Sequence, residues 1–297
     1  MDPKWKPKFI ERYKCLTDID KFLEYSIKPL PKTLRVNTLK TTINEMKKKL
    51  ELKQIPWCKE GFTTEGYGLG NTKEHFMGYF YLQSAASMIP PVVLNPEPGD
   101  LVLDMCASPG SKTSQMAAMM KNQGLIVAND VVINRLKPLT LNLQRCGVTN
   151  SVITLMEGRW FKNYNFDKIL VDAPCSGIGT IRKSPKTIQT WNPNVGKTMA
   201  GVQKQLLKTA FTSLNENGTL VYSTCTTEPD ENEAIVDHIL TNVDNIKLQK
   251  ISIDIKHSKP IEEFENKSYS SEVKKTLRIW PQDNDTEGFF VAKFKKC

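Results

Sequence analysis

Short apolar runs that alternate with helical stretches constrain the fold of this chain more than any other feature. Five runs typical of buried strands follow one another after residue 100, at 101–104, 125–129, 151–155, 168–172 and 218–224. Helical stretches separate them, which is the rhythm of βαβ units. The pattern predicts an α/β fold with a doubly wound, mostly parallel sheet. Two more runs, at 276–280 and 288–294, are expected to close that sheet as a pair of strands.

The first ninety residues show a different pattern. The spacing of their apolar residues predicts a helix over 8–26, a strand over 34–38 and an amphipathic helix over 43–52. Together these elements predict a small α+β module. Turn-forming residues precede the first strong strand, and we place the domain boundary between 75 and 98. Residues 1–90 would form the module and residues 91–297 the larger domain.

Composition excludes several classes of protein. Of the 297 residues, 39% are hydrophobic and 25% are charged, as in ordinary soluble globular proteins. No run approaches the roughly 18 apolar residues of a membrane span, and the Lys-rich start lacks the apolar stretch of a signal peptide. We therefore expect a cytoplasmic protein.

The cysteines and histidines predict neither disulfides nor a metal site. The chain has seven cysteines, an odd number, which are scattered and form no C-x-x-C pair. This pattern is typical of free thiols in a reducing compartment. The three histidines, His75, His238 and His257, lie far apart and away from any cysteine pair. We expect no bound metal.

Positive charge is concentrated near the amino terminus. The chain has a formal net charge of +9, and residues 1–50 hold 13 Lys and Arg against 6 Asp and Glu, a net +7. A polyanionic partner such as RNA explains this excess. A Lys-rich surface that only confers solubility explains it about as well. Charge alone does not separate the two.

The segment DMCASPGSKT, residues 104–113, predicts a cofactor loop. It follows the first strand and precedes a helix, at the sheet edge where α/β proteins bind ligands. It is neither a P-loop nor a dinucleotide loop, because Cys106 and Ser111 occupy the P-loop glycine positions and Gly110 is its only glycine. Asp130, at the end of the second strand, stands where such folds place a carboxylate that binds ribose hydroxyls. The alternative for Asp130 is a helix N-cap.

Two further cysteines follow two other strands. Cys175 lies in DAPCSG, residues 172–177, and Cys225 lies in STCT, residues 223–226. The carboxyl ends of parallel strands meet at one edge, so both thiols are expected to face the cofactor. Buried cysteine commonly acts as a small inert hydrophobe. We keep that interpretation for Cys15, Cys58, Cys106 and Cys146.

In order and spacing, these motifs resemble the NSun/Sun/Nop family of S-adenosylmethionine-dependent RNA cytosine-5 methyltransferases. The motifs that carry the resemblance are DMCASPGSKT, AND (128–130), DAPCSG and YSTCTTEPDENE (222–233). The resemblance extends from LRVNTLK (34–40) through YLQSAASM (81–88) to the last strand. It implies a class I methyltransferase, Rossmann-like fold with a small N-terminal α+β RNA-binding module. It also implies S-adenosylmethionine as cofactor, RNA as substrate and a monomeric protein.

The resemblance implies roles for individual residues. The loop that wraps the cofactor would consist of Cys106, Ala107, Ser108, Pro109, Gly110, Ser111 and Lys112. Asp130, Glu157 and Asp172 would contact the ribose, the adenine and the methionine side of the cofactor, and Arg135 would be a further contact. Glu157 stands where the family usually has Asp.

The chemistry of cytosine explains why such an enzyme needs two thiols and an acid. Carbon 5 is too electron-poor to take a methyl group until a nucleophile has added to carbon 6. By the resemblance, Cys225 is that nucleophile and Cys175 assists release of the product. Lys112 would activate the thiol, and Asp172 would act as general acid near N3 of the ring.

Several alternatives were weighed. A DNA cytosine-5 methyltransferase would carry a Glu-Asn-Val triplet, which does not occur. A zinc cytidine deaminase needs P-C-x-x-C, and position 178 is Ile. An RNA assembly factor with little turnover stays open. So does rRNA in place of tRNA, although small members of the family favour tRNA.

Arg35 and the lysines at 47–49 are expected to contact RNA phosphates.

Overall fold

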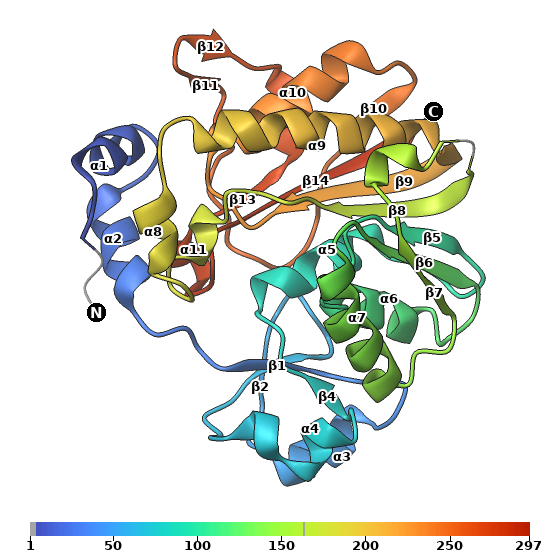
Figure 1. Cartoon of the computed structure of the whole chain (residues 1–297). Coiled ribbons are helices and arrows are strands. Elements are labelled where there is room, and N and C mark those ends of the chain that lie inside the picture. Colours follow the sequence, from blue (N-terminus) through green and yellow to red (C-terminus); the bar gives the residue numbers. More distant parts are fainter. Residues whose placement is uncertain (1–3, 163) are drawn as a thin grey trace.

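The larger part of the chain is built on one mixed sheet with helices on both of its faces (Figure 1). This computed structural model describes residues 4–162 and 164–297. The strand order is β10-β14-β9-β8-β5-β6-β7, and β13 also pairs with β14. The strands are β5 (Leu101–Asp104), β6 (Leu125–Asp130), β7 (Ser151–Leu155), β8 (Phe166–Asp172), β9 (Leu214–Thr224), β10 (Ile246–Gln249), β13 (Leu277–Ile279) and β14 (Phe289–Lys296).

Strands β5 to β9 run parallel to one another. Strands β10, β13 and β14 form antiparallel pairs, and β14 is also antiparallel to β9. The chain moves outward from β5 through β6 to β7 and then returns to β8 on the other side of β5. The strand order therefore reverses between β5 and β8, where doubly wound sheets open a ligand crevice. The predicted doubly wound, mostly parallel sheet is confirmed.

Each face of the sheet has its own apolar core. Helices α9 (Val195–Thr212) and α10 (Glu233–Asn242) cover one face, and Leu207 and Ile235 are fully buried there. Helices α5 (Ile89–Leu94) and α6 (Ser111–Met119) cover the other (Figure 1). Helix α7 (Ile133–Cys146) packs beside β6 and β7. This two-sided cover leaves the ends of the strands open.

A second, four-stranded antiparallel sheet with the order β2-β3-β1-β4 lies in the N-terminal part of the chain. Its elements are β1 (Thr33–Val36), α3 (Ile43–Lys49), β2 (Lys53–Gln54), β3 (Gly61–Thr63), α4 (Lys73–Phe76) and β4 (Phe80–Tyr81). Leu34, Met46 and Phe62 form its buried core. Helix α3 begins with a capping box between Thr42 and Glu45.

The first helices do not join this small sheet. In place of one helix over 8–26, the chain forms α1 (Pro7–Lys14) and α2 (Ile19–Ile27), and Asp18 caps the second by accepting from the Lys21 amide. Their aromatic side chains pack on the larger domain: the Phe9 ring meets Trp191 at a centroid distance of 5.1 Å. Helices α1 and α2 therefore lie against the larger domain and not against the small sheet. The boundary between residues 90 and 91 stays a prediction.

The remaining described elements are short. They are η1 (Leu69–Asn71), η2 (Ala86–Met88), η3 (Gly158–Trp160), η4 (Ile178–Thr180), α8 (Lys186–Thr190), η5 (Pro229–Glu231), β11 (Glu263–Phe264), β12 (Lys267–Ser268), η6 (Ser271–Lys275) and α11 (Pro281–Asn284). Within 4–162 and 164–297, no helix is both long enough and apolar enough to span a bilayer.

Candidate active site

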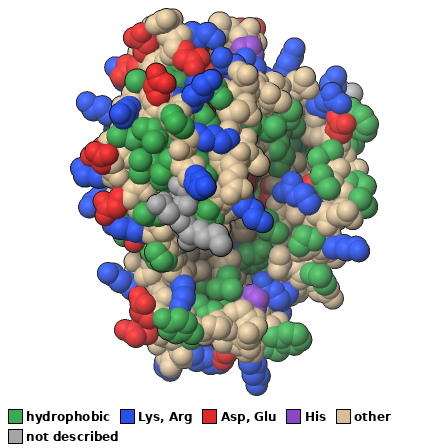
Figure 2. All heavy atoms as spheres, turned by 60° about the vertical axis from the view of Figure 1, so that its left-hand side comes forward, with side chains coloured by type: hydrophobic (Ala, Val, Ile, Leu, Met, Phe, Trp, Pro, Cys, Tyr) green, Lys and Arg blue, Asp and Glu red, His purple; other side chains and the backbone are tan. Residues whose placement is uncertain are grey.

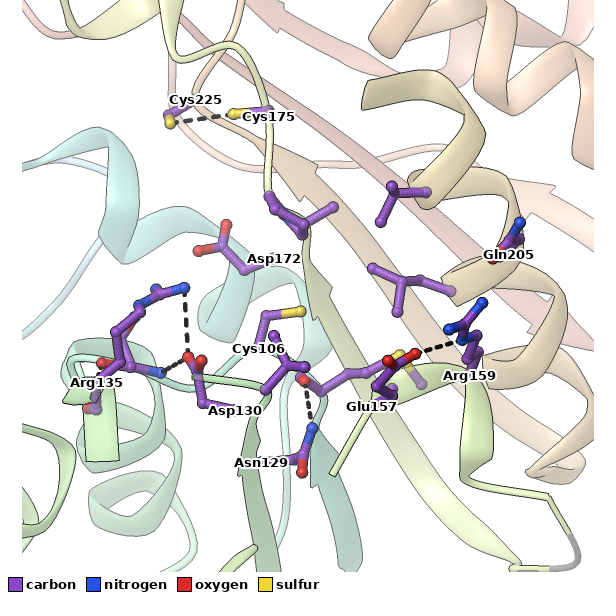
Figure 3. Close-up of a pocket in the computed structure, with 18 residues that line it drawn as sticks. Cys106, Asn129, Asp130, Arg135, Glu157, Arg159, Asp172, Cys175, Gln205 and Cys225 are labelled. Carbon is purple, nitrogen blue, oxygen red and sulfur yellow. Dashed lines mark hydrogen bonds and ion pairs between the residues drawn. The ribbon is translucent and has the colours of Figure 1, made fainter. Parts of the chain in front are cut away.

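A pocket of about 450 Å³ opens at the carboxyl ends of the five parallel strands (Figure 3). Eight residues predicted from the sequence line it: Cys106, Ser108, Asp130, Arg135, Glu157, Asp172, Cys175 and Cys225. They follow β5, β6, β7, β8 and β9, which bring them together at the point where the strand order reverses. In Figure 3 the two sulfurs lie at one end, Asp130 and Glu157 at the other, and Asp172 between them.

Five residues of the predicted cofactor loop do not line the pocket: Ala107, Pro109, Gly110, Ser111 and Lys112. They support it instead. Gly110 precedes α6 with a φ of +95°, and a Cβ there would lie 3.1 Å from Cδ1 of Leu139. Such a backbone conformation strains residues other than glycine. The close turn lets α6 begin directly behind the pocket, with Lys112 in its first turn.

Asp130 is held by backbone amides at the end of β6. Its Oδ2 accepts from the Ser108 amide at 3.3 Å, and its Oδ1 accepts from the Val132 amide at 3.1 Å. Arg135 lies 3.5 Å from Oδ2 and also donates to the Ser108 carbonyl. The N-cap of α7 is Val132, so the alternative of an N-cap role for Asp130 is wrong. The carboxylate is instead fixed against the pocket wall.

Asp172 and Lys112 form an ion pair between the thiols and the rest of the pocket. Nζ of Lys112 lies 2.7 Å from Oδ2 of Asp172, and the Ser223 hydroxyl donates to Oδ1 at 2.7 Å. Burial by itself would lower the pKa of Lys112, but the Asp172 carboxylate outweighs that effect and raises it. Lys112 therefore stays an ammonium while nine-tenths buried.

The two thiols touch. Sγ of Cys175 lies 3.3 Å from Sγ of Cys225, although 50 residues separate them in the chain. The hydrogen bond to Cys225, followed by burial, raises the pKa of the Cys175 thiol well above its ordinary range. Cys175 therefore keeps its proton and can donate it toward the sulfur of Cys225. The Cys225 carbonyl accepts from the Gly179 amide at 3.0 Å, which anchors the other side of that residue.

Several pocket residues were missed by sequence reasoning. Val202, Gln205 and Leu206 of α9 form one wall, and their spacing looked like that of any helix packed on a sheet. Arg159 pairs with Glu157 in the turn after β7. Asn129 ties strand ends together, donating to the Met105 and Met156 carbonyls at 3.1 and 2.8 Å. The AND motif was the signal for Asn129, whereas the residues of α9 carried none.

The other cysteines lie outside this thiol pair. Burial raises the pKa of the Cys106 thiol far above its ordinary range, and Cys58 and Cys146 are buried. Cys15 is exposed, so its interpretation as a buried hydrophobe is wrong. Among the residues that the structure describes, no group of three or more His, Cys, Asp or Glu side chains could hold a metal.

The residues predicted to contact RNA phosphates divide into two groups. The lysines at 47–49 are exposed on α3, where Lys49 pairs with Glu74 at 2.9 Å. Arg35 is wrong as a phosphate contact, because it is 1% exposed and donates to Gln83 and Ser114 at 2.8 Å. It joins β1 to α6 instead. Figure 2 shows a face that is hollowed near its middle, with Lys and Arg side chains on both sides of the hollow.

The pocket fits S-adenosylmethionine by size and by the chemistry of its lining. Its volume lies within the roughly 300–1,000 Å³ of small-molecule sites. Carboxylates after β6, β7 and β8 can accept from the hydroxyl and amine groups of such a cofactor. Apolar side chains from Met105, Val202 and Leu206 offer a surface for a planar base.

Comparisons with known proteins agree with this geometry. Residues 91–295 match the family model of 16S rRNA methyltransferase RsmB/F, and residues 6–85 match the N-terminal domain of 16S rRNA methyltransferase RsmF. A tRNA (cytosine(49)-C(5))-methyltransferase of Pyrococcus abyssi is 46% identical, with 99% of this chain and 97% of the relative covered. Ribosomal RNA small subunit methyltransferase F of Shewanella loihica is 40% identical over 94% of this chain, which spans 59% of that relative.

Solved structures show the same fold. The crystal structure of a methyltransferase homolog protein from Pyrococcus horikoshii matches with a TM-score of 0.89 and 37% identity, covering 99% of this chain and 96% of the other. NSun6 from Pyrococcus horikoshii matches with a TM-score of 0.87 over 100% of this chain and 99% of its own, at 24% identity.

Proposed function

The chain belongs to the RsmB/F family of RNA methyltransferases, and from this premise we propose that it methylates carbon 5 of cytidine in tRNA through a covalent cysteine adduct. The observation that carries the proposal is the contact between Cys175 and Cys225 beside Asp172. A pyrimidine methylated at carbon 5 needs a thiol to add at carbon 6 and a base to remove a proton afterwards. One pocket here holds both kinds of group.

Cys225 is proposed as the nucleophile. The raised pKa of the Cys175 thiol makes it the less reactive of the pair, which leaves the neighbouring sulfur of Cys225 as the attacking atom. As that sulfur attacks, its proton would pass to the Asp172 carboxylate, which the Lys112 ammonium holds at 2.7 Å. In the addition step, the S–C6 bond forms and the electron pair of the C5–C6 double bond moves toward N3.

Asp172 and Lys112 are proposed to meet the charge that develops at N3. Asp172 would pass the proton that it receives from the attacking thiol on to N3 as general acid, and the ammonium 2.7 Å away keeps the carboxyl group oriented. Ser223 holds the other oxygen in place. After methyl transfer, Cys175 would give its own proton to the departing sulfur of Cys225 and take up the proton of carbon 5 in its place. The electron pair then re-forms the double bond, and the S–C6 bond breaks.

S-adenosylmethionine, when bound, supplies an electrophilic methyl group. The residues proposed to hold it are Asp130, Glu157 and Asp172, with Arg135 and the loop from Cys106 to Lys112 beside them. Fixed amides orient Asp130, so it can accept from ribose hydroxyls without reorganising. Glu157 forms an ion pair with Arg159. Its side chain, which is longer than that of the usual Asp, is proposed to reach the adenine amine.

tRNA is the favoured RNA because of how the chain aligns with its relatives. It covers 97% of the tRNA enzyme of Pyrococcus abyssi at 46% identity, whereas it spans about 60% of the ribosomal RNA enzymes at 40 or 41% identity. A ribosomal RNA substrate is the second candidate, favoured only by the family models.

A non-catalytic RNA-binding factor is less compatible with the site. Such a protein would need neither a thiol pair in contact nor a buried ammonium paired with a carboxylate. The test is incubation of the protein with tritiated S-adenosylmethionine and bulk RNA, with the tRNA and rRNA fractions counted separately. Label in 5-methylcytidine of tRNA supports the proposal, label in rRNA alone selects the second candidate, and no label contradicts both. Cys225→Ala is the matched control.

A further inference from the structure

A buried hydrogen-bonded cluster joins the two loops that carry the thiols, outside the part of the pocket discussed above. Its members are Ser176, Thr226 and Glu231, and we name it the thiol clasp. Ser176 follows Cys175, and Thr226 follows Cys225. The Ser176 and Thr226 hydroxyl oxygens lie 2.7 Å apart. One hydroxyl–hydroxyl bond therefore links the neighbours of the two catalytic cysteines directly.

Glu231 holds this link from behind. Its Oε2 accepts from the Ser176 amide at 2.9 Å, and its Oε1 accepts from the Ser176 hydroxyl. Gln203 of α9 donates to Oε2 at 3.0 Å and to the Pro174 carbonyl at 3.0 Å. The loop on both sides of Cys175 is thus tied to one carboxyl group. Thr226, Gln203 and Glu231 are fully buried, with no exposed surface.

We propose that Glu231 is a positioning residue, which through Ser176 and Thr226 sets the distance between the Cys175 and Cys225 sulfurs and so times product release. The proposal rests on the proposed function for its catalytic consequence, but not for its geometric claim. The hydrogen bonds of the Glu231 carboxyl group go to Ser176 and Gln203, so its geometric effect on the sulfurs passes through the two loops, while its charge also raises the pKa of Cys175. Glu231 lies in the motif YSTCTTEPDENE (222–233), for which the sequence predicted no role of the glutamate.

The hydrogen bonds of the clasp should affect product release more than the attack on carbon 6. Cys225 is anchored independently through its carbonyl, which accepts from Gly179, whose own carbonyl accepts from Gly288. The Cys175 loop is held at its two ends, where the Ala173 amide donates to the Ser223 carbonyl and the Gly177 carbonyl accepts from Thr180. Between these ends, residues 174–176 are held by the hydrogen bonds to Gln203, Glu231 and Thr226. Loss of the clasp should therefore displace Cys175 while Cys225 keeps its place for attack.

The first test measures the distance between the thiols without RNA. In a full-length protein carrying Cys15→Ser and Cys297→Ser, equilibrium with glutathione disulfide converts the two thiols to one Cys175–Cys225 disulfide and two glutathione molecules. The fraction of linked peptide, measured by mass spectrometry, gives the effective concentration of one thiol at the other. We expect Ser176→Ala, Thr226→Val and Glu231→Ala to lower it by about tenfold, the effect of one lost buried hydrogen bond.

Conservative variants and a matched control sharpen this test. Thr226→Ser keeps the hydroxyl and Glu231→Gln keeps an acceptor, so both should restore the wild-type value. Glu233→Gln is the control, because Glu233 is also fully buried but bonds Arg278 and the Ile261 amide instead of either thiol loop. An unchanged effective concentration in folded Ser176→Ala and Thr226→Val would overturn the clasp, as would a wild-type protein that forms no such disulfide.

The second test asks what the clasp does in turnover. In a single turnover with RNA, Ser176→Ala should still attack but accumulate a covalent enzyme–RNA adduct on a denaturing gel, and Thr226→Ser should not. If the clasp variants keep the wild-type effective concentration of the thiols and the protein methylates RNA normally, the clasp is contradicted. If the clasp variants lower the effective concentration of the thiols but the wild-type protein methylates no RNA, the proposed function is contradicted and the clasp is not. Equal adduct in Ser176→Ala and wild type contradicts its role in release.

Discussion

The sulfur of Cys175 lies 3.3 Å from the sulfur of Cys225, although 50 residues separate the two thiols in the chain. That contact, followed by burial, raises the pKa of the Cys175 thiol well above its ordinary range. The two thiols are therefore proposed to have different roles. The separation of roles leads to opposite expectations for the two alanine variants.

Cys225→Ala should abolish methyl transfer and leave cofactor binding nearly unchanged, because the thiol contributes to the chemical step. The measurements are single-turnover transfer of tritiated methyl groups and calorimetric titration with S-adenosylmethionine. Cys15→Ala, which removes an exposed thiol far from the pocket, should behave as wild type. Methyl transfer above about one per cent of the wild-type rate would show that Cys225 is not the nucleophile.

Cys175→Ala should still attack and methylate but fail to release the RNA. A denaturing gel should show a slow band that contains both protein and RNA, which grows with time and persists after the cofactor is consumed. The double variant with Cys225→Ala should lose this band. If the band instead appears in Cys225→Ala alone, the two thiols have the opposite roles.

Asp130→Ala should weaken the binding of S-adenosylmethionine by about 1.5–3 kcal/mol, the usual effect of losing a charge-assisted hydrogen bond. Because Asp130 also accepts from two backbone amides, Asp130→Asn should accompany it, and thermal melting should confirm that both fold. Glu157→Asp should be mild, since it introduces the usual family residue. Unchanged affinity in Asp130→Ala would contradict the ribose contact.

The stability of the protein should fall as pH rises through the ionisation of Glu231. Burial raises the pKa of Glu231 to about 7 in the folded state, from about 4.5 in an unfolded chain. Between these two pKa values the folded state binds more protons than the unfolded chain. The stability that Glu231 contributes is therefore complete below the lower pKa and is lost as pH rises through the higher one. Chemical denaturation should show wild type losing about 2–3 kcal/mol relative to Glu231→Gln between about pH 5 and 8.

That comparison also controls for a second buried acid. Burial raises the pKa of Asp104 to about 7 as well, which gives a slope of the same sign. Asp104 is present in both proteins, so its contribution cancels in the difference. Parallel curves for wild type and Glu231→Gln would show that Glu231 ionises alike in the folded and unfolded chain.

Neutralising Lys47, Lys48 and Lys49 together should weaken RNA binding and flatten its dependence on salt, while cofactor affinity stays unchanged. Phosphate contacts release counterions, which is why such binding weakens with salt. Lys49 already pairs with Glu74, so Lys47 and Lys48 should account for most of the effect. The matched control is the triple change Lys→Arg at the same positions, which keeps the charge. Unchanged binding from about 50 to 200 mM salt would mean that the run is only a solvated helix face.

Much of the larger domain follows from local patterns. Strands β5 and β7 have the predicted bounds, and β6, β8 and β9 extend the predicted runs by a few residues. Apolar runs of that length have few alternatives once helices alternate with them. The motifs also placed Asp130, Cys175 and Cys225 at strand ends, because the turn after a strand is a local property of the chain.

Other features depended on packing partners far away in the sequence. The aromatic residues of α1 and α2 could have covered any apolar surface, and only the fold selected Trp191 and Trp280. The guanidinium of Arg35 looked like a surface charge, yet Gln83 and Ser114 surround it. A period of 3.6 residues marks a buried face of a helix without saying what covers it.

By itself the sequence determined the order of strands and helices, the fold class and the residues at the end of each strand, since these depend on neighbouring residues along the chain. The tertiary structure alone decided that two sulfurs 50 residues apart would touch, that α9 would wall the pocket and that Glu231 would hold both thiol loops. Distances between side chains on different strands are set by sheet order and by packing on both faces. No local pattern of residues encodes them.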